Sequence, residues 1–288
     1  MLYQISHTTH YAYDQPVTLQ PHIIRLRPRS DHTQALKQFS LQVSPIPKQE
    51  SAIVDLDGNP LIKVWFDREP TTSLTIQTLL QVETYQENPF IYLIEPWAAQ
   101  LPIDYPASLL GQLQPYLMGS QLAYTGSGLD PIAQQLAQEI LYQVDGNTIR
   151  FLSELNQLIY TSCTQEVRDN GHPHPPSITW TQKQGSCRDY TVLFMEVCRA
   201  VGIPARFVSG YQEGDIDTTD RHLHAWAEVY LPGAGWRGYD PTHGLAVADR
   251  HIALVASALS RYAAPVVGAY SPSGVQSVMT YNLLLQRF

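Results

Sequence analysis

Three residue types that together can carry out thiol-based acyl transfer lie in the C-terminal half of the sequence. Cys187 follows a Gly-Ser pair at the start of an apolar run, His224 begins HAWAEVYL, and Asp240 ends GWRGYD. A cysteine nucleophile needs an imidazole to accept its proton, and the imidazole needs a carboxylate or amide to orient it. Each residue also has a structural alternative: a small buried cysteine, a sheet histidine and a turn aspartate before Pro241. The three can act together only if the elements that carry them meet in space.

The residues around Cys187 predict a helix that begins at this cysteine. Ser186, followed three residues later by Asp189, has the pattern of a capping box, and Gly202 and Pro204 are expected to end the helix. At the first helical position, the free amides and the helix dipole favour a negative charge on the cysteine sulfur. The apolar positions are too broad for a surface stripe and predict a largely buried helix: Val192, Leu193, Phe194, Met195, Val197, Ala200 and Val201.

Two predicted strands could place His224 beside Asp240. Alternation puts His224 and Trp226 on one face of the strand HAWAEVYL. If the loop to the next strand has an odd length centred on Gly233, Trp226 lies opposite Asp240. His224 is then a diagonal neighbour of Asp240 at ~7–8 Å between backbones, within reach of two side chains. A loop of even length would place the two on opposite faces, and the sequence leaves both registers open.

A metal site is the alternative use of these histidines. His222 and His224 form an HxH pair that could hold zinc together with Asp220 or with Cys187. An HxH pair with no further close cluster is a weak pattern for zinc. We therefore expect no metal and no cofactor.

The other two cysteines, Cys163 and Cys198, are expected to be structural. Three cysteines cannot all pair, and their spacing fits neither a zinc ribbon nor a CxxC redox motif. Reduced thiols in the cytoplasm are the expectation. The N-terminus lacks a basic start and an apolar stretch of the signal-peptide type, which agrees with a cytoplasmic location.

Composition argues against several function classes. With 288 residues, 44% hydrophobic and 15% charged, the chain has the composition of a soluble globular protein of one large or two modest domains. The formal net charge of −8 argues against a general nucleic-acid binder. No apolar run reaches about 18 residues and no basic amphipathic stretch occurs, so no membrane partner is expected. The expected partner is a protein or peptide substrate, and the oligomeric state is not predicted.

The pattern changes along the chain and predicts two parts, residues 1–87 and 88–288. The first part contains short alternating runs at 36–45, 51–59, 60–67 and 72–84, with a hairpin signal at Asp57-Gly58-Asn59, and predicts a small antiparallel sandwich. His7 and His10 are expected at its surface or in a hairpin. The second part begins with a connecting segment and predicts helices at 107–119, 131–144 and 147–163, followed by the Cys187 helix and three strands. Its tail predicts a helix at 251–262 and a strand at 277–286.

The order of four motifs resembles the core of the transglutaminase-like superfamily. These are G-S-C-R-D-Y before a helix, R-A-x-G-I-P-A-R-x-V-x-G-Y, H-A-W-A-E-V-Y and G-W-x-x-x-D-P-T, within about residues 180–245. The first part, with the run His7-Thr8-Thr9-His10-Tyr11, resembles the N-terminal region that precedes this core in many bacterial members, and DRHIAL at 249–254 is similar to that group as well. The resemblance implies an α+β fold, in which a papain-like core follows the sandwich.

The resemblance also implies a catalytic triad without calcium. Cys187 matches the nucleophile, His224 the general base and Asp240 the residue that orients the base. The oxyanion donor is expected to be the backbone amide of Cys187, and a side-chain donor is left open among Trp180, Gln182 and Gln184. The calcium-binding loops of the animal enzymes have no counterpart in this sequence, so no metal is predicted.

The implied reaction is acyl transfer on peptide or carboxamide substrates through a thioester. Hydrolysis, as in a cysteine peptidase or amidase, is the favoured outcome. The alternatives are a protein-glutamine transglutaminase, which uses an amine acceptor, and a catalytically silent module that binds peptides. Nothing in the triad separates water from an amine as the second nucleophile.

Overall fold

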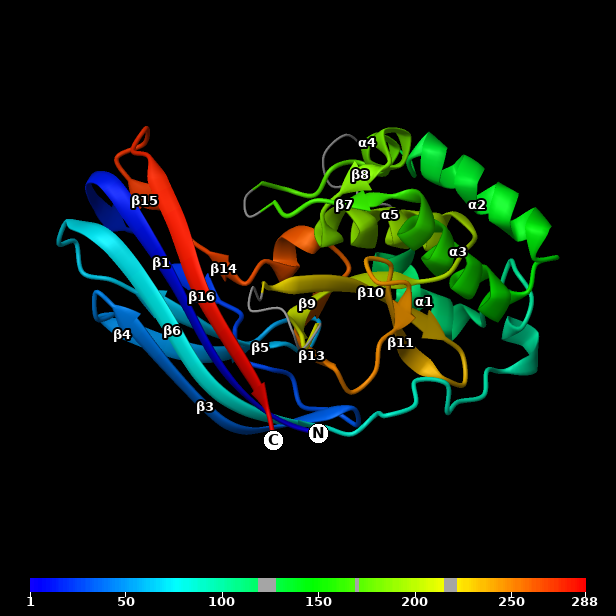
Figure 1. Cartoon of the computed structure of the whole chain (residues 1–288), viewed down its shortest axis with the longest axis horizontal. Helices are drawn as coiled ribbons and strands as arrows, with labels where there is room; N and C mark the ends of the chain where they lie inside the picture. The colour runs from blue at the N-terminus through cyan, green and yellow to red at the C-terminus, as the bar shows by residue number, and fades with distance from the viewer. Residues whose placement is uncertain (119–127, 169–170, 215–221) are drawn as a thin grey trace.

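The computed structural model describes residues 1–118, 128–168, 171–214 and 222–288 of the chain (Figure 1). Two antiparallel sheets fill one end of the molecule, and helices packed on a third sheet fill the other. This arrangement confirms the predicted α+β class with a β-sandwich at the N-terminus.

The N-terminal part is a sandwich of two sheets. One sheet has the order β15-β1-β6-β3 with β16 also paired to β1, and the other has the order β14-β2-β5-β4. The predicted hairpin is present between β4 and β5, where Asp55 Oδ1 accepts the backbone amides of Asp57 (3.0 Å) and Asn59 (2.9 Å). The strands contributed by this part are β1 (Leu2–Leu19), β2 (His22–Ile24), β3 (Gln34–Ser44), β4 (Gln49–Val54), β5 (Pro60–Trp65) and β6 (Thr71–Thr84).

Alternation along β1 points every second side chain inward. Tyr3, Ile5, His7 and Thr9 are all buried, so the expectation that His7 lies at the surface is wrong. His7 shares the inner face with Ile5 because the two residues are one period of the strand apart. Its Nδ1 lies 3.0 Å from the hydroxyl of Tyr211 in the other part of the molecule.

The C-terminal strands return to this sandwich. They are β14 (Val266–Val267), β15 (Tyr270–Ser271) and β16 (Ser277–Arg287). The predicted final strand is confirmed as β16, which pairs antiparallel with β1 from Tyr13↔Ser277 to Tyr3↔Arg287. The two termini therefore lie side by side (Figure 1). The division of the chain at 87/88 remains a prediction. Strand β16, which lies within residues 88–288, joins the sheet that contains β1.

The second part surrounds helix α5 with helices and a five-stranded sheet. The predicted helices at 107–119, 131–144 and 147–163 are confirmed within a residue or two. The helices are η1 (Pro96–Ala98), α1 (Ala107–Leu117), α2 (Pro131–Gln143), α3 (Thr148–Ser162), α4 (Pro176–Gln182), α5 (Cys187–Ala200) and η3 (Ser260–Ala263). The sheet has the order β12-β11-β10-β9-β13, with β9 (Ala205–Gln212), β10 (His224–Leu231), β11 (Gly235–Asp240), β12 (Leu245–Ala246) and β13 (His251–Ser257). A separate parallel pair joins β7 (Thr164–Gln165) to β8 (Gln184–Gly185).

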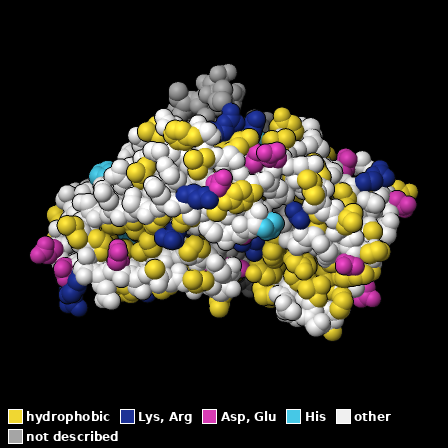
Figure 2. Space-filling view, turned by 90° about the horizontal axis from the view of Figure 1, so that it is seen from below, with side chains coloured by type: hydrophobic (Ala, Val, Ile, Leu, Met, Phe, Trp, Pro, Cys, Tyr) yellow, Lys and Arg dark blue, Asp and Glu magenta, His cyan; other side chains and the backbone are white. Residues whose placement is uncertain are grey.

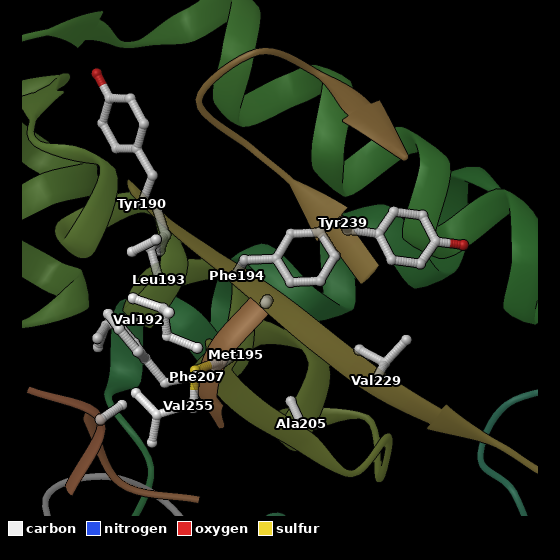
Figure 3. Close-up of a cluster of buried hydrophobic side chains, with 14 of the residues drawn as sticks. Tyr190, Val192, Leu193, Phe194, Met195, Ala205, Phe207, Val229, Tyr239 and Val255 are labelled. Atoms are coloured by element: carbon white, nitrogen blue, oxygen red, sulfur yellow. The ribbon is translucent and has the colours of Figure 1, made fainter. Parts of the chain in front are cut away.

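Helix α5 is the centre of this part, as its apolar pattern predicts. Leu193, Phe194 and Val197 are fully buried, and Phe194 stacks on Tyr239 of β11 at 5.6 Å between ring centroids (Figure 3). Full burial of such side chains contributes about 1.5–3 kcal/mol each, so the helix holds its position firmly.

The predicted helix at 251–262 is wrong. Residues 251–257 form β13, antiparallel to β9, and the 3-10 turn η3 follows. Every residue of β13 is buried. A strand that is buried on both faces shows no alternation, so its apolar run cannot be told from a buried helix by periodicity.

Charged side chains are spread over the surface, as expected for a chain with 15% charged residues. On the face shown in Figure 2, acidic and basic side chains are mixed and form no patch of one sign. Within the ranges the structure describes, no helix combines the length and the apolar character needed to cross a membrane.

Candidate active site

The start of α5 fixes Cys187. The predicted capping box is present, and Asp189 Oδ2 accepts the backbone amide (2.7 Å) and the hydroxyl (2.8 Å) of Ser186. The carboxylate of Asp189 is fully buried, and its other oxygen accepts Arg168 Nη2 at 2.6 Å and the backbone amide of His174 at 2.7 Å. The half-buried Cys187 therefore lies on a first helical turn that a partly buried ion pair holds in place.

The hairpin between β10 and β11 has the register that brings His224 to Asp240. The strands pair from Leu231↔Gly235 to Ala227↔Tyr239, which leaves a three-residue loop centred on Gly233. Continued by one residue, this register sets Trp226 opposite Asp240. The odd-length loop is thereby confirmed. Gly233 has φ +84°, a left-handed conformation that glycine adopts without strain.

The three predicted site residues meet in the structure. His224 Nε2 donates to Asp240 Oδ2 at 2.8 Å, and the thiol of Cys187 is a further hydrogen-bond partner of His224. His224 is 8% exposed and Asp240 is fully buried, so their interaction is shielded from water. Their catalytic role remains a prediction, but their geometry is that of a nucleophile, a base and an orienting carboxylate.

The electrostatics of the pair favour an imidazolium beside a carboxylate. Burial alone lowers the pKa of His224, but the charge and hydrogen bond of Asp240, together with the Cys187 thiol, raise it to about 10. Burial alone raises the pKa of Asp240, yet the charge of His224 and the hydrogen bonds of three histidines hold it well below its usual range. The two groups titrate as a coupled unit.

Sequence reasoning missed two histidines that share this carboxylate. His243 Nδ1 and His251 Nε2 lie 2.9 and 3.1 Å from Asp240 Oδ2, and the backbone amide of Thr242 donates to Oδ1 at 3.0 Å. An ionised carboxylate only accepts, so each histidine must present an N–H. Burial lowers the pKa of His251 despite the opposing effect of Asp240, which favours a neutral ring. DRHIAL was the only sequence signal that pointed toward His251.

The other ring nitrogen of His251, Nδ1, makes no contact with Asp240. This Nδ1 has no hydrogen-bond partner among the described residues, and the ring packs edge-on against Trp226 at 5.2 Å between centroids. Both residues line a small cavity of about 50 Å³, which is large enough for water. Asp240 thus contacts His224, which lines the Cys187 cleft described below, and His251, which lines this small cavity.

A cleft of about 490 Å³ opens at Cys187 between the two parts of the molecule. We call it the Cys187 cleft. On the core side it is lined by residues 165–168, 186–188 and 222–225, together with Ser209, Gln212, Gly214 and His243. On the sandwich side it is lined by His7, Thr9 and Tyr11 of β1, by Pro265 and Val266, and by Met279 and Tyr281 of β16.

The side-chain oxyanion donors suggested by the sequence lie elsewhere. Trp180 packs under the ammonium of Lys183, and Gln184 donates to Glu166 at 3.0 Å. Neither of them, nor Gln182, is among the residues that line the Cys187 cleft in the described part of the chain. Gln165 does line it, and no sequence motif marks that residue. The backbone amide of Cys187 remains the candidate donor.

The residues proposed for a zinc site are engaged in other contacts. His222 Nδ1 forms a hydrogen bond with the hydroxyl of Tyr281, while Asp220 lies outside the described residues. Among the described residues, two groups have ligand atoms close enough for one cation, namely His224, Asp240 and His243, and Glu166, His174 and Asp189. In each group N–H donors already satisfy the central carboxylate.

Two family models match the chain. Residues 134–241 match the transglutaminase-like superfamily, and residues 3–83 match the bacterial transglutaminase-like N-terminal region. The core of the chain, residues 134–241, belongs to the transglutaminase-like superfamily. The resemblance predicted from the motifs is confirmed, and the core match begins well before the first of those motifs.

The chain is similar to proteins of several bacteria. An uncharacterized protein of Mycobacterium tuberculosis is 28% identical over 269 residues, which cover 87% of this chain and 81% of that protein. A protein-glutamine gamma-glutamyltransferase of Pseudomonas aeruginosa is 39% identical over 71 residues, 22% of this chain and 11% of that protein. The crystal structure of a protein of Cytophaga hutchinsonii, named a "Putative Cysteine Protease", covers all of this chain with a TM-score of 0.75 and 19% identity, over 91% of its own length. That likeness shows the fold of both parts together.

Proposed function

We propose that the protein is a thiol-dependent enzyme that cleaves peptide or carboxamide bonds through a thioester on Cys187, with water as the usual acceptor. The observation that carries this proposal is the position of Cys187 at the start of α5 beside His224, whose ring is held by the buried Asp240. Membership of the transglutaminase-like superfamily supports the same chemistry.

In the first step, the sulfur of Cys187 attacks the carbonyl carbon and the carbonyl oxygen becomes an oxyanion. The backbone amide of Cys187, at the start of α5, is the proposed donor that stabilises this charge. The intermediate then expels the amine or ammonia, which takes the proton of the His224 imidazolium, and a thioester remains. A pKa of about 10 keeps His224 protonated near neutral pH and thus ready to serve as this acid.

In the second step, the neutral His224 takes a proton from water as the water oxygen attacks the thioester. The carbon–sulfur bond breaks, the acid is released, and the thiolate and imidazolium are restored. Asp240 stabilises the imidazolium and keeps the ring oriented in both steps.

An amine acceptor is the second candidate. The relative of Pseudomonas aeruginosa, whose similarity covers only a short segment, is named for transfer from protein glutamine. An amine that enters the Cys187 cleft would attack the same thioester and give a new amide instead of an acid.

Mass spectrometry of a peptide-amide library, incubated with and without a primary amine, tests the proposal. We expect acid products without the amine, and amide adducts only if the second candidate holds. Cys187→Ala should abolish both, whereas the matched variant Cys163→Ala should retain them. The absence of any Cys187-dependent product in either mixture would contradict the proposal and favour a silent peptide-binding module.

A further inference from the structure

The sandwich supplies one wall of the Cys187 cleft. In the antiparallel pair of β1 and β16, Tyr11 lies opposite Met279 and Thr9 lies opposite Tyr281. All four residues line the cleft. They form two adjacent cross-strand pairs on one face, and we call this group the sheet wall.

Alternation in β16 separates the sheet wall from the outer surface. Met279 and Tyr281 are partly buried on the cleft side. Val278 and Thr280 are exposed on the opposite face, with Val278 65% exposed. The strand thus offers two cleft residues and two matched neighbours that do not line the cleft.

Tyr281 is tied to the core across the cleft. Its hydroxyl forms a hydrogen bond with His222 Nδ1, and the two rings make an edge contact at 5.6 Å between centroids. His222 lies two residues before His224, so the contact sets the sheet wall close to the site. The ring of Tyr281 is therefore held in one orientation toward the cleft.

The sheet wall carries no charged side chain. The acidic and basic side chains that line the cleft lie near Cys187, and each already has a hydrogen-bond or ion-pair partner. Arg168 binds Asp189 at 2.6 Å, Glu166 accepts from Gln184 at 3.0 Å, and Arg188 donates to the backbone oxygen of Arg168. A charged substrate group placed against Met279 and Tyr281 would lose its water without gaining a counter-ion. An apolar group would gain by the same burial.

We propose that the sheet wall is an acyl-donor subsite that binds a bulky apolar side chain of a peptide, next to the residue whose carbonyl reacts. Met279 and Tyr281 are its specificity-determining residues. The position of the reacting carbonyl rests on the proposed function, but the binding of an apolar peptide does not. One extra or missing methylene group in a hydrophobic pocket gives about 10- to 200-fold discrimination between substrates.

Binding is measured first in the Cys187→Ala protein, which cannot form a thioester. The probes are fluorescent peptide amides that differ at one position, with Leu or Phe against Ala, Asp or Lys. We expect Leu and Phe to bind about 10-fold tighter or more. Met279→Ala and Tyr281→Ala should each reduce this preference, and Tyr281→Phe should keep it because the apolar ring remains. Val278→Ala and Thr280→Ala should leave it unchanged.

Turnover by the parent enzyme is the second measurement, as the ratio of kcat/KM for the same peptides. A preference in binding without any Cys187-dependent turnover would overturn the proposed function and leave the subsite standing. Cys187-dependent turnover with equal binding of all five peptides would overturn the subsite and leave the function standing. An equal loss of preference in the Val278 and Met279 variants would also overturn the subsite, because it would assign the effect to the stability of β16.

Discussion

At the scale of single residues, one carboxylate organises the site. Asp240 receives N–H donors from three histidines on one oxygen, and only His224 among them also partners Cys187. Cys187, His224 and Asp240 could be singled out from the sequence because each stands in a local motif of fixed spacing. His243 and His251 could not, since nothing in a turn or in a buried strand indicates which atom a histidine faces.

Replacing Asp240 tests its orienting role. Asp240→Asn should retain the fold and lower kcat, because the amide still holds the imidazole but stabilises its cation less. Asp240→Ala should lower kcat further, and turnover of a peptide amide measures both. Turnover as fast as the parent in both variants would reduce Asp240 to a turn residue.

The pH dependence of His224 follows from the same pair. Since its pKa rises from 6.5 in the unfolded chain to about 10 in the folded protein, the stabilisation is fully present below pH 6.5 and is lost as the pH rises through about 10. The difference in unfolding free energy between the parent and Asp240→Asn should therefore shrink over this window. Urea denaturation at a series of pH values measures it, and a constant difference would contradict the pairing.

His251 is expected to act as a positioning residue through Asp240. His251→Phe keeps a buried ring but removes the donor, which should destabilise the protein by about 1.5–3 kcal/mol and lower kcat with little change in KM. His251→Gln retains a donor and should restore part of kcat. A pH–rate profile for kcat should shift in the Phe variant alone, whereas a purely structural role would leave the profile unmoved.

At the scale of elements, the sequence predicts those helices and strands whose residues carry a cap, a turn signal or a regular alternation of apolar and polar side chains. The capped helix α5, the hairpin β10–β11 and the strands of the sandwich follow from caps, turns and alternation. β13 was mistaken for a helix because both of its faces are buried. The pairing of β16 with β1 joins residues more than 260 positions apart, and no local signal specifies such a contact.

Burial of His7 on the inner face of β1 predicts a loss of stability in acid. Burial lowers the pKa of His7 to about 4, so between pH 6.5 and 4 the unfolded chain binds the extra proton. Stability should fall across this window by on the order of 3 kcal/mol from this residue. Urea titrations should show a shallower fall for His7→Gln, with His10→Gln as the matched control on β1. Identical slopes for the parent and His7→Gln would contradict the account.

At the scale of the whole molecule, both parts meet at a buried glutamate. Glu213 follows β9 and is 4% exposed. It accepts the hydroxyl of Tyr3 at 3.1 Å and pairs with Arg287 at 3.2 Å and Arg250 at 3.6 Å. These contacts hold β1 and β16 against the core, and so hold the sheet wall opposite Cys187.

Loss of this contact should weaken the join between the two parts. Glu213→Gln removes the charge but keeps the shape, and we expect about 1–3 kcal/mol lower unfolding free energy by urea denaturation. Because the sheet wall depends on the same join, KM for apolar peptides should rise more than kcat falls. Glu50→Gln, an exposed site on β4, is the control. Equal effects of the two substitutions would show that Glu213 does not stabilise the contact between the two parts.

Alkylation by iodoacetamide tests the claim that Cys187 is an activated nucleophile paired with His224. A free thiol has a pKa of about 8.5, so an ordinary cysteine reacts quickly only in alkaline solution. We expect fast alkylation well below pH 8 at Cys187 and not at Cys163 or Cys198, located by peptide mass spectrometry. His224→Ala should shift the profile toward alkaline pH. A Cys187 profile that rises only above about pH 8 and does not move in His224→Ala would contradict the claim.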